Sequence, residues 1–172
     1  MEKIQSHFVG QNISSNSAEA FSLFEKSRFG EKSEEKIVYS FAETLFLVEK
    51  GTMEVFQGNK ELNKNELMKK LLKFDKRINL KFTVFRDLRK KGYTVKTALK
   101  FGADFRVYDK GKKISEDHAK WVVFAEHESG KVSWHEFSAK NRVAHSTRKK
   151  LLIAVVDDEE DITYYEVSWV KP

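Results

Sequence analysis

Three residues in the second half of the sequence, Tyr108, His118 and Lys149, have side chains suited to joint acid–base chemistry. In model peptides tyrosine titrates at about pH 10, histidine at about 6.5 and lysine at about 10.4. At neutral pH they therefore offer a phenol, a partly protonated imidazole and a fixed positive charge. This inventory suits attack by a ribose 2′-hydroxyl on the adjacent phosphate of RNA, which needs a base, an acid for the departing 5′-oxygen and positive charge on the phosphorane.

The three residues would divide this work unequally. His118 is the natural acid and Lys149 the natural electrostatic clamp. Tyr108 is a weak base, because only about 0.1% of a free tyrosine is ionised at pH 7. A neighbouring cation such as Lys149 would raise that fraction, or Tyr108 would mainly orient the 2′-hydroxyl. Each residue also has an ordinary explanation by itself: a strand-end ring, a surface imidazole and a solvated lysine.

The elements that would position these residues are strands. Four runs rich in β-branched and aromatic residues, separated by polar turns, predict a sheet: residues 93–109, 120–128, 150–157 and 162–170. Between the second and third runs, residues 133–147 predict a helix with Ser133 as its N-cap. A strand, helix, strand arrangement follows, with the helix packed on a mixed sheet.

The first half has a different pattern. Residues 17–29 predict a short helix with Gly30 as its C-cap, and residues 37–51 predict a helix followed by a strand at 53–58. Residues 67–91 predict helix with a break near 74–76. The expected fold class is α/β (α+β), with a small mixed N-terminal lobe at 1–84 and a C-terminal domain at 85–172.

Composition narrows the class of partner. The 172 residues include 40% hydrophobic residues and 14 Phe, enough for a packed core in one domain or two small lobes. The 32 Lys and Arg against 26 Asp and Glu give a net charge of +6, which favours polyanionic partners such as nucleic acid. Without cysteine, neither a disulfide framework nor a thiolate metal site can form. No stretch has the pattern of a signal peptide or membrane span, so we expect a soluble, cytoplasmic protein.

Four segments together resemble the catalytic domain of the archaeal tRNA-splicing (tRNA-intron) endonucleases. They are FGADFRVYDKG, DHAKWVVF, RVAHSTRKKLLIAVVD and ITYYEVSWVKP, and the resemblance covers about residues 85–172. It implies a restriction-endonuclease-like catalytic domain and a catalytic triad of Tyr108, His118 and Lys149. The N-terminal lobe matches more loosely, in size and helical character.

The resemblance also implies a reaction. Enzymes of this family cut precursor tRNA at two sites in a bulge-helix-bulge structure, leaving a 2′,3′-cyclic phosphate and a 5′-hydroxyl without a metal or other cofactor. Arg142 matches a family arginine that stacks on a bulge base, a contact well suited to a planar guanidinium. By itself Arg142 would be read as a solvated helix residue.

Five consecutive acids between two predicted strands need a separate explanation. Such a run is most often a solvated turn, and binding of a hard metal ion is a second possibility. The resemblance implies that this loop docks into a basic pocket on a neighbouring subunit and helps to assemble a homotetramer. The run comprises Asp157, Asp158, Glu159, Glu160 and Asp161.

Two other classes of protein compete with a metal-independent nuclease. A basic RNA-binding or structural subunit without activity would explain the charge and the aromatic residues. A metal-dependent nuclease could use Asp104, Glu126, His127 or Glu128. However, alternation along a strand puts Glu126 and Glu128 on one face and His127 on the other, which disfavours a compact ligand set.

Overall fold

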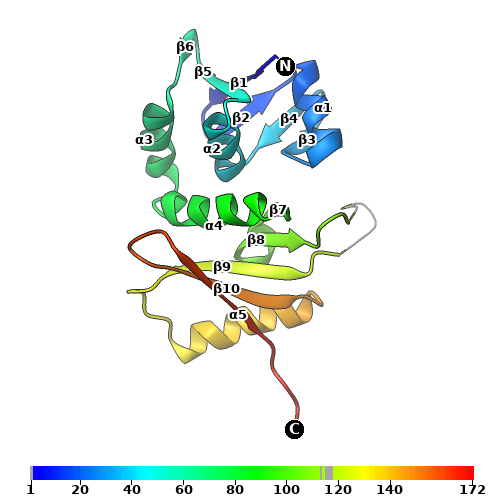
Figure 1. Ribbon diagram of the computed structural model, residues 1–172, viewed down its shortest axis with the longest axis vertical. Helices are drawn as coiled ribbons and strands as arrows, with labels where there is room; N and C mark the ends of the chain where they lie inside the picture. Colours follow the sequence, from blue (N-terminus) through cyan, green and yellow to red (C-terminus); the bar gives the residue numbers. More distant parts are fainter. Residues whose placement is uncertain (1, 113, 115–117) are drawn as a thin grey trace. The chain divides into compact units, whose positions relative to one another are not determined.

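The computed structural model describes residues 2–112, 114 and 118–172 of the chain, which form two compact units, Met1–Phe82 and Thr83–Pro172 (Figure 1). Each unit has its own sheet. The charged loop that the sequence places between Tyr108 and His118 includes residues 113 and 115–117, which lie outside the described residues.

The N-terminal unit contains a six-stranded sheet in the order β3-β4-β2-β1-β5-β6. Strands β1 and β5 run parallel and the other neighbouring pairs antiparallel. The strands are β1 (Ile4–Val9), β2 (Asn12–Ser15), β3 (Glu31–Ser33), β4 (Lys36–Tyr39), β5 (Met53–Gln57) and β6 (Lys60–Glu61). The helices are α1 (Ala18–Ser27), α2 (Phe41–Glu49), α3 (Lys64–Phe74) and the start of α4 (Ile78–Lys90), within which the division between the units falls.

The predicted helix at 37–51 is wrong over its first residues. These form β4, which pairs with β2 through Ile13 and Tyr39. Helix α2 begins only after Ser40, whose side chain accepts the backbone N–H of Glu43 while the Glu43 carboxylate accepts that of Ser40. The apolar run therefore forms a strand and then a helix. The strand predicted at 53–58 is confirmed as β5.

Gly30 is not the C-cap of the first helix, contrary to the sequence-based expectation. Arg28 holds that position with φ 57°, and its N–H donates to the Phe24 carbonyl. A glycine is required at position 30 for close packing, because a Cβ there would collide with Ile37 Cγ2. The predicted break between helices is confirmed: α3 ends at the C-cap Asp75, and α4 begins at Ile78.

The C-terminal unit contains a five-stranded sheet in the order β11-β10-β9-β8-β7, in which only β9 and β10 run parallel. The predicted sheet is confirmed, although the first run forms two strands separated by a 3₁₀ turn at Leu99–Phe101. The strands are β7 (Thr94–Ala98), β8 (Ala103–Tyr108), β9 (Trp121–His127), β10 (Lys150–Val156) and β11 (Ile162–Val167). Helix α5 (Trp134–Ser146) links β9 to β10 and has Ser133 as its N-cap, as predicted.

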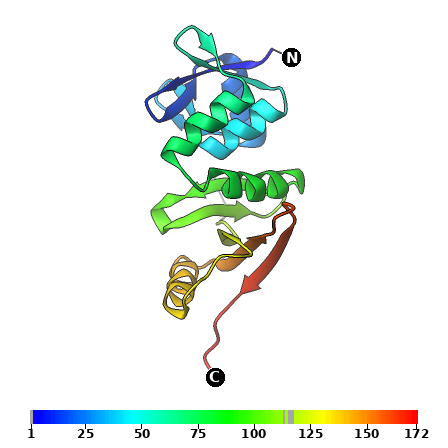
Figure 2. The ribbon, with the colours of Figure 1, turned by 90° about the vertical axis from the view of Figure 1, so that its left-hand side faces the viewer.

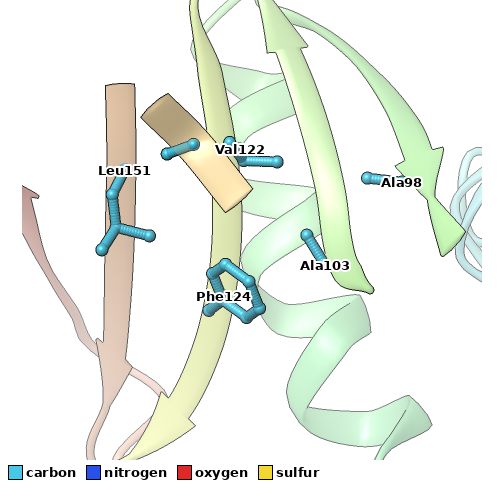
Figure 3. Close-up of a cluster of buried hydrophobic side chains, with 6 residues drawn as sticks. Ala98, Ala103, Val122, Phe124 and Leu151 are labelled. Carbon is cyan, nitrogen blue, oxygen red and sulfur yellow. The ribbon is translucent and has the colours of Figure 1, made fainter. Parts of the chain in front are cut away.

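The two faces of this sheet are covered by different helices (Figure 2). Helix α5 packs on one face, where its Ala144 belongs to the same buried cluster as three side chains of the sheet, Val122, Phe124 and Leu151. Figure 3 shows these three side chains. On the other face, Phe85 of α4 contacts Phe105, with ring centroids 5.7 Å apart. None of the helices in the described part of the chain has the length and apolar character that crossing a membrane requires.

Candidate active site

Backbone pairing at one end of the C-terminal sheet brings two of the three predicted catalytic residues to the same level. Lys120 donates its N–H to the carbonyl of Val107 (2.8 Å) and accepts the N–H of Lys150 (2.9 Å). Tyr108 directly follows Val107, and Lys149 directly precedes Lys150. The end of β8 and the start of β10 therefore flank the segment that enters β9.

Tyr108 and Lys149 also lie on the same face of this sheet. The register pairs Arg106 with Val122 and Val122 with Leu151. Tyr108 is two residues after Arg106, and Lys149 is two residues before Leu151, so alternation returns both to that face. Two strand spacings separate them, which puts their Cα atoms about 10 Å apart. This is the face on which α5 packs.

The end of helix α5 fixes the position of Lys149. The Lys149 N–H donates to the Ala144 carbonyl, and the Arg148 N–H donates to that of His145. Arg148 has φ 56°. These features form a Schellman motif, with an arginine at the left-handed position where glycine is usual. The motif ends the helix abruptly, so Lys149 enters the sheet at once.

The Lys149 ammonium is held by neutral groups. Its Nζ donates to the Thr147 carbonyl (2.9 Å) and lies 5.1 Å from the centre of the Phe101 ring. Burial lowers the pKa of Lys149 below its ordinary value of 10.5, and the charge of Arg106 lowers it further. The sequence reasoning missed both Phe101 and Arg106. The signal for Arg106 was its place two residues before Tyr108 on the same strand face.

His118 differs from the other two residues in its surroundings. It is exposed, whereas Tyr108 is only 5% exposed and Lys149 is half-buried. His118 lies two residues before Lys120, on the segment that enters β9. Within the described residues, no hydrogen bond joins the side chains of Tyr108, His118 and Lys149. The arrangement is a buried phenol and a half-buried cation on one face, next to an accessible imidazole.

Arg142 lies at a separate place. It is exposed on α5 and lines a pocket of about 520 Å³. Phe137 and Asn141 of α5, together with Val167 and Trp169 at and beyond the end of β11, form much of the remaining wall. None of the three predicted catalytic residues lines this pocket.

The five acids lie at the opposite end of β10, in the turn before β11. The Asp157 carboxylate accepts the N–H groups of Glu159 and Asp161, each at 2.9 Å. Arg86 of α4 donates to Glu160 (2.7 Å), and His127 Nε2 lies 3.1 Å from Asp158 Oδ1. The run is a turn, as its composition indicates, and three of its carboxylates have partners within the unit.

Three of the residues that a metal-dependent nuclease could use as ligands already interact with other groups of the protein. Asp104 accepts the N–H of Ala125 (2.8 Å), and Glu126 lies 3.5 Å from the ammonium of Lys140 on α5. His127 pairs with Asp158. The partners of Glu126 and His127 come from α5 and from the acidic turn respectively, as expected for opposite faces of a strand. Among the described residues, no group of three or more His, Asp or Glu side chains is close enough to hold a metal ion.

Two family models match the chain. The model of the tRNA intron endonuclease catalytic C-terminal domain matches residues 78–164, and that of the N-terminal domain matches residues 4–68. The chain belongs to the tRNA intron endonuclease family. The catalytic-domain match spans Tyr108, His118 and Lys149.

Individual relatives agree with this assignment. A tRNA-splicing endonuclease of Nanoarchaeum equitans is 48% identical over 136 residues, which are 76% of this chain and 87% of the relative. One of Thermococcus gammatolerans is 41% identical over 149 residues, 87% of each chain. One of Pyrococcus abyssi is 36% identical over 169 residues, 98% of this chain and 97% of the relative. Membership of the tRNA intron endonuclease family thus extends over both units.

Proposed function

We propose that this chain is a tRNA-splicing endonuclease that cuts precursor tRNA at bulge-helix-bulge sites by metal-independent transesterification. The products would be a 2′,3′-cyclic phosphate and a 5′-hydroxyl, formed in the cytoplasm by a catalytic domain at residues 85–172. The observation that carries the proposal is the placement of Tyr108 and Lys149 at the same level of one sheet face, beside the segment that begins at His118. Family membership supplies the substrate class.

In the proposed reaction, the 2′-oxygen attacks the adjacent phosphorus as the bond from phosphorus to the 5′-oxygen breaks. The His118 imidazolium gives its proton to the departing 5′-oxygen, which suits an exposed group that exchanges protons with solvent. The Lys149 ammonium stabilises the charge on the phosphorane. Its partners are a carbonyl and an aromatic ring, which leave its positive charge uncompensated by either group.

Tyr108 acts on the 2′-hydroxyl in one of two ways. As a phenolate it would accept the proton of that hydroxyl, and as a phenol it would hold the hydroxyl in line for attack. The burial of its ring in the sheet supports a fixed position in either case. Arg106 shares this sheet face with Tyr108 and Lys149, and its charge lowers the pKa of Lys149.

Arg142 is proposed to contact a base of the bulge. The support is its exposure and the largely apolar wall beside it, to which Phe137 and Trp169 contribute aromatic rings. Guanidinium planes and aromatic rings are the groups on which unpaired RNA bases stack. Since the pocket lies apart from Tyr108 and Lys149, this contact would position the RNA and take no part in bond cleavage.

The acidic turn at 157–161 is proposed to dock on a neighbouring subunit in a homotetramer. Asp158 is 85% exposed at its side chain and Glu160 is 62% exposed, so both carboxylates remain accessible despite their contacts with His127 and Arg86. Light scattering tests this proposal. Asp158→Asn combined with Glu160→Gln should lower the mass of the particle, and a wild-type monomer would contradict the proposal outright.

The deciding experiment is cleavage of a synthetic bulge-helix-bulge RNA in EDTA, with the product ends mapped. Wild type should leave cyclic phosphate ends. His118→Ala should cut roughly 10²- to 10⁴-fold more slowly, the usual contribution of a general acid. His135→Ala is the matched control, because His135 is also exposed in this unit but is not part of the proposed site.

Three results would contradict the proposed reaction. Cleavage that EDTA abolishes would indicate a metal-dependent nuclease. Equal rates for His118→Ala and wild type would remove His118 from the mechanism. RNA binding without cleavage by the wild type would identify a structural or RNA-binding subunit that needs a catalytic partner.

A further inference from the structure

Positive charge is concentrated in one part of the chain. Residues 64–91, which contain α3 and α4, hold 11 Lys and Arg against three Asp and Glu, a net charge of +8. The whole chain holds 32 against 26, a net charge of +6. All remaining residues together therefore carry a net charge of −2, so the basic character of this protein comes from these two helices.

Two cations in and directly after the part of α4 that lies in the C-terminal unit have acidic partners. Arg86 pairs with Glu160, and Lys91 pairs with Asp87 at 2.6 Å. Most lysines around α3, in contrast, have no acidic partner in the part of the chain that the structure describes. Its two nearby acids are taken by lysines outside the helix, Glu66 by Lys60 at 2.5 Å and Asp75 by Lys81 at 2.8 Å.

Four other lysines lie at this helix or directly after it. Within the described residues none of them forms an ion pair. We call this set the α3 lysine surface. It consists of Lys69, Lys70, Lys73 and Lys76.

Lys69, Lys73 and Lys76 are exposed to solvent, and Lys70 is half-buried. Leu67 and Leu71 are both 0% exposed and define the buried side of α3. At about 100° per residue, Lys69 and Lys73 lie on the opposite side, one turn apart. Lys76 follows the C-cap Asp75. A favourable interaction with the helix dipole accounts for Lys73 in the last turn but falls off within that turn, so it leaves Lys69 unexplained.

We propose that the α3 lysine surface binds the phosphate backbone of the RNA substrate, outside the place where the RNA is cut. It would supply affinity that does not depend on sequence, because each phosphate that a lysine neutralises releases counterions. Lysine suits this task as a flexible point charge without the directional demands of arginine. The choice of RNA as the partner rests on the proposed function.

A protein partner fits this surface less well. Protein interfaces are depleted in lysine and are centred on buried aromatic or arginine side chains. The exposed aromatic ring at this end of α3 is Phe74, and it already packs against the rings of Phe8 and Phe41 in its own unit. The α3 lysine surface thus offers charge without an apolar anchor, which matches a polyanionic backbone.

The test compares two triple variants of the full chain with the same net charge. The first carries Lys69→Gln, Lys73→Gln and Lys76→Gln. The control carries Lys26→Gln, Lys32→Gln and Lys36→Gln, three exposed lysines of the same unit. The probe is bulge-helix-bulge RNA with 2′-deoxy groups at the cleavage positions, which removes the attacking hydroxyl. The equilibrium dissociation constant is measured from low to high salt concentration.

We expect the first variant to reduce the slope of log affinity against log salt concentration by about 2 to 3, since each lost phosphate contact contributes about 0.7 to 0.9. The control should keep the wild-type slope. At saturating unmodified RNA, the cleavage rate of the first variant should stay within about twofold of wild type, because no group that acts on the reacting phosphate is changed.

Equal slopes for the two variants would overturn the proposal, and so would a wild type that does not bind the probe. A first variant that changes mass in light scattering but keeps the wild-type slope would assign the surface to contact between subunits. Failure of the proposed reaction would look different: the wild type would not cut unmodified RNA, while the difference in slope between the variants would persist.

Discussion

Strands β9 and β10 of the C-terminal unit have different chemistry at their two ends. At the end where they begin, Lys149 interacts with a carbonyl and a ring, and His118 is exposed. At the end where they finish, His127 pairs with Asp158, and the Asp157 carboxylate is occupied by two backbone N–H groups. The same parallel pair thus has one end where the lysine has only neutral partners among the described residues and one end where the carboxylates are engaged by protein groups.

The difference lies in how each charge is compensated. A cation whose partners are neutral can still interact with an incoming phosphate, whereas a carboxylate bound to backbone N–H groups stabilises a turn. The presence of titratable residues is therefore a poor guide to a site by itself. The following substitutions test whether chemistry depends on the first end alone.

The largest effect in this comparison is expected for Lys149. Lys149→Ala should slow single-turnover cleavage by roughly 10²- to 10³-fold, the usual loss when one preorganised electrostatic group is removed. Lys150→Ala is the control, because Lys150 faces the other side of the sheet and pairs with Glu166 at 2.8 Å. A similar loss in both variants would mean that position 149 has no special role.

The pH dependence gives a second test of Lys149. Because its pKa is lowered, its charge is lost at a lower pH than that of an ordinary lysine. Cleavage that needs the ammonium should therefore fall as the pH rises toward 10.5, the ordinary value. In Lys149→Arg this fall should move to higher pH, since arginine stays protonated. An unchanged alkaline limb would show that another group controls it.

Tyr108→Phe removes one hydroxyl and keeps the buried ring. A lost hydrogen bond of about 1 to 1.5 kcal/mol corresponds to roughly tenfold slower cleavage, which we expect if Tyr108 orients the 2′-hydroxyl. A loss of roughly 10²- to 10⁴-fold would instead identify Tyr108 as the base. Tyr165→Phe, on the exposed part of β11, is the control and should not change the rate.

A smaller effect is expected for Phe101, which positions Lys149. Phe101→Leu keeps an apolar side chain but loses the cation–π contact, worth about 0.5 to 1 kcal/mol, so cleavage should slow about two- to fivefold. In a Lys149→Ala background the same change should have no effect. Additive losses in the double variant would show that Phe101 acts independently of Lys149.

The smallest effect on cleavage is expected at the acidic end. Asp157→Ala should lower the free energy of unfolding by about 1 kcal/mol, because two N–H groups lose their acceptor. Asp157→Asn keeps an acceptor oxygen and should be closer to wild type. Denaturant unfolding measures both. A cleavage rate per assembled enzyme that falls more than about twofold would show that the two ends are coupled.

Local signals in the sequence predicted part of the fold well. Ser133 was predicted as the N-cap of a helix, and the structure confirms it, with Glu136 completing a capping box. The break between two helices at Asp75 was also predicted from the local sequence. The strand at Lys36–Tyr39 was not predicted, because its apolar residues fit a helix equally well until β2 pairs with them. Pairing partners far apart in the chain decided this element.

The sequence by itself determined the chemical types present: a phenol, an imidazole, a lysine, an acidic run and a basic segment. Only the tertiary structure decided which of them lie near one another. Register across β8, β9 and β10 put Tyr108 and Lys149 on one face and added Arg106 and Phe101, which have no motif of their own. It also placed Arg142 apart from them, at a pocket beside α5 and the end of β11. The physical reason is that a side chain's charge depends on its covalent structure, whereas its partners and burial depend on neighbours that the chain supplies only after folding.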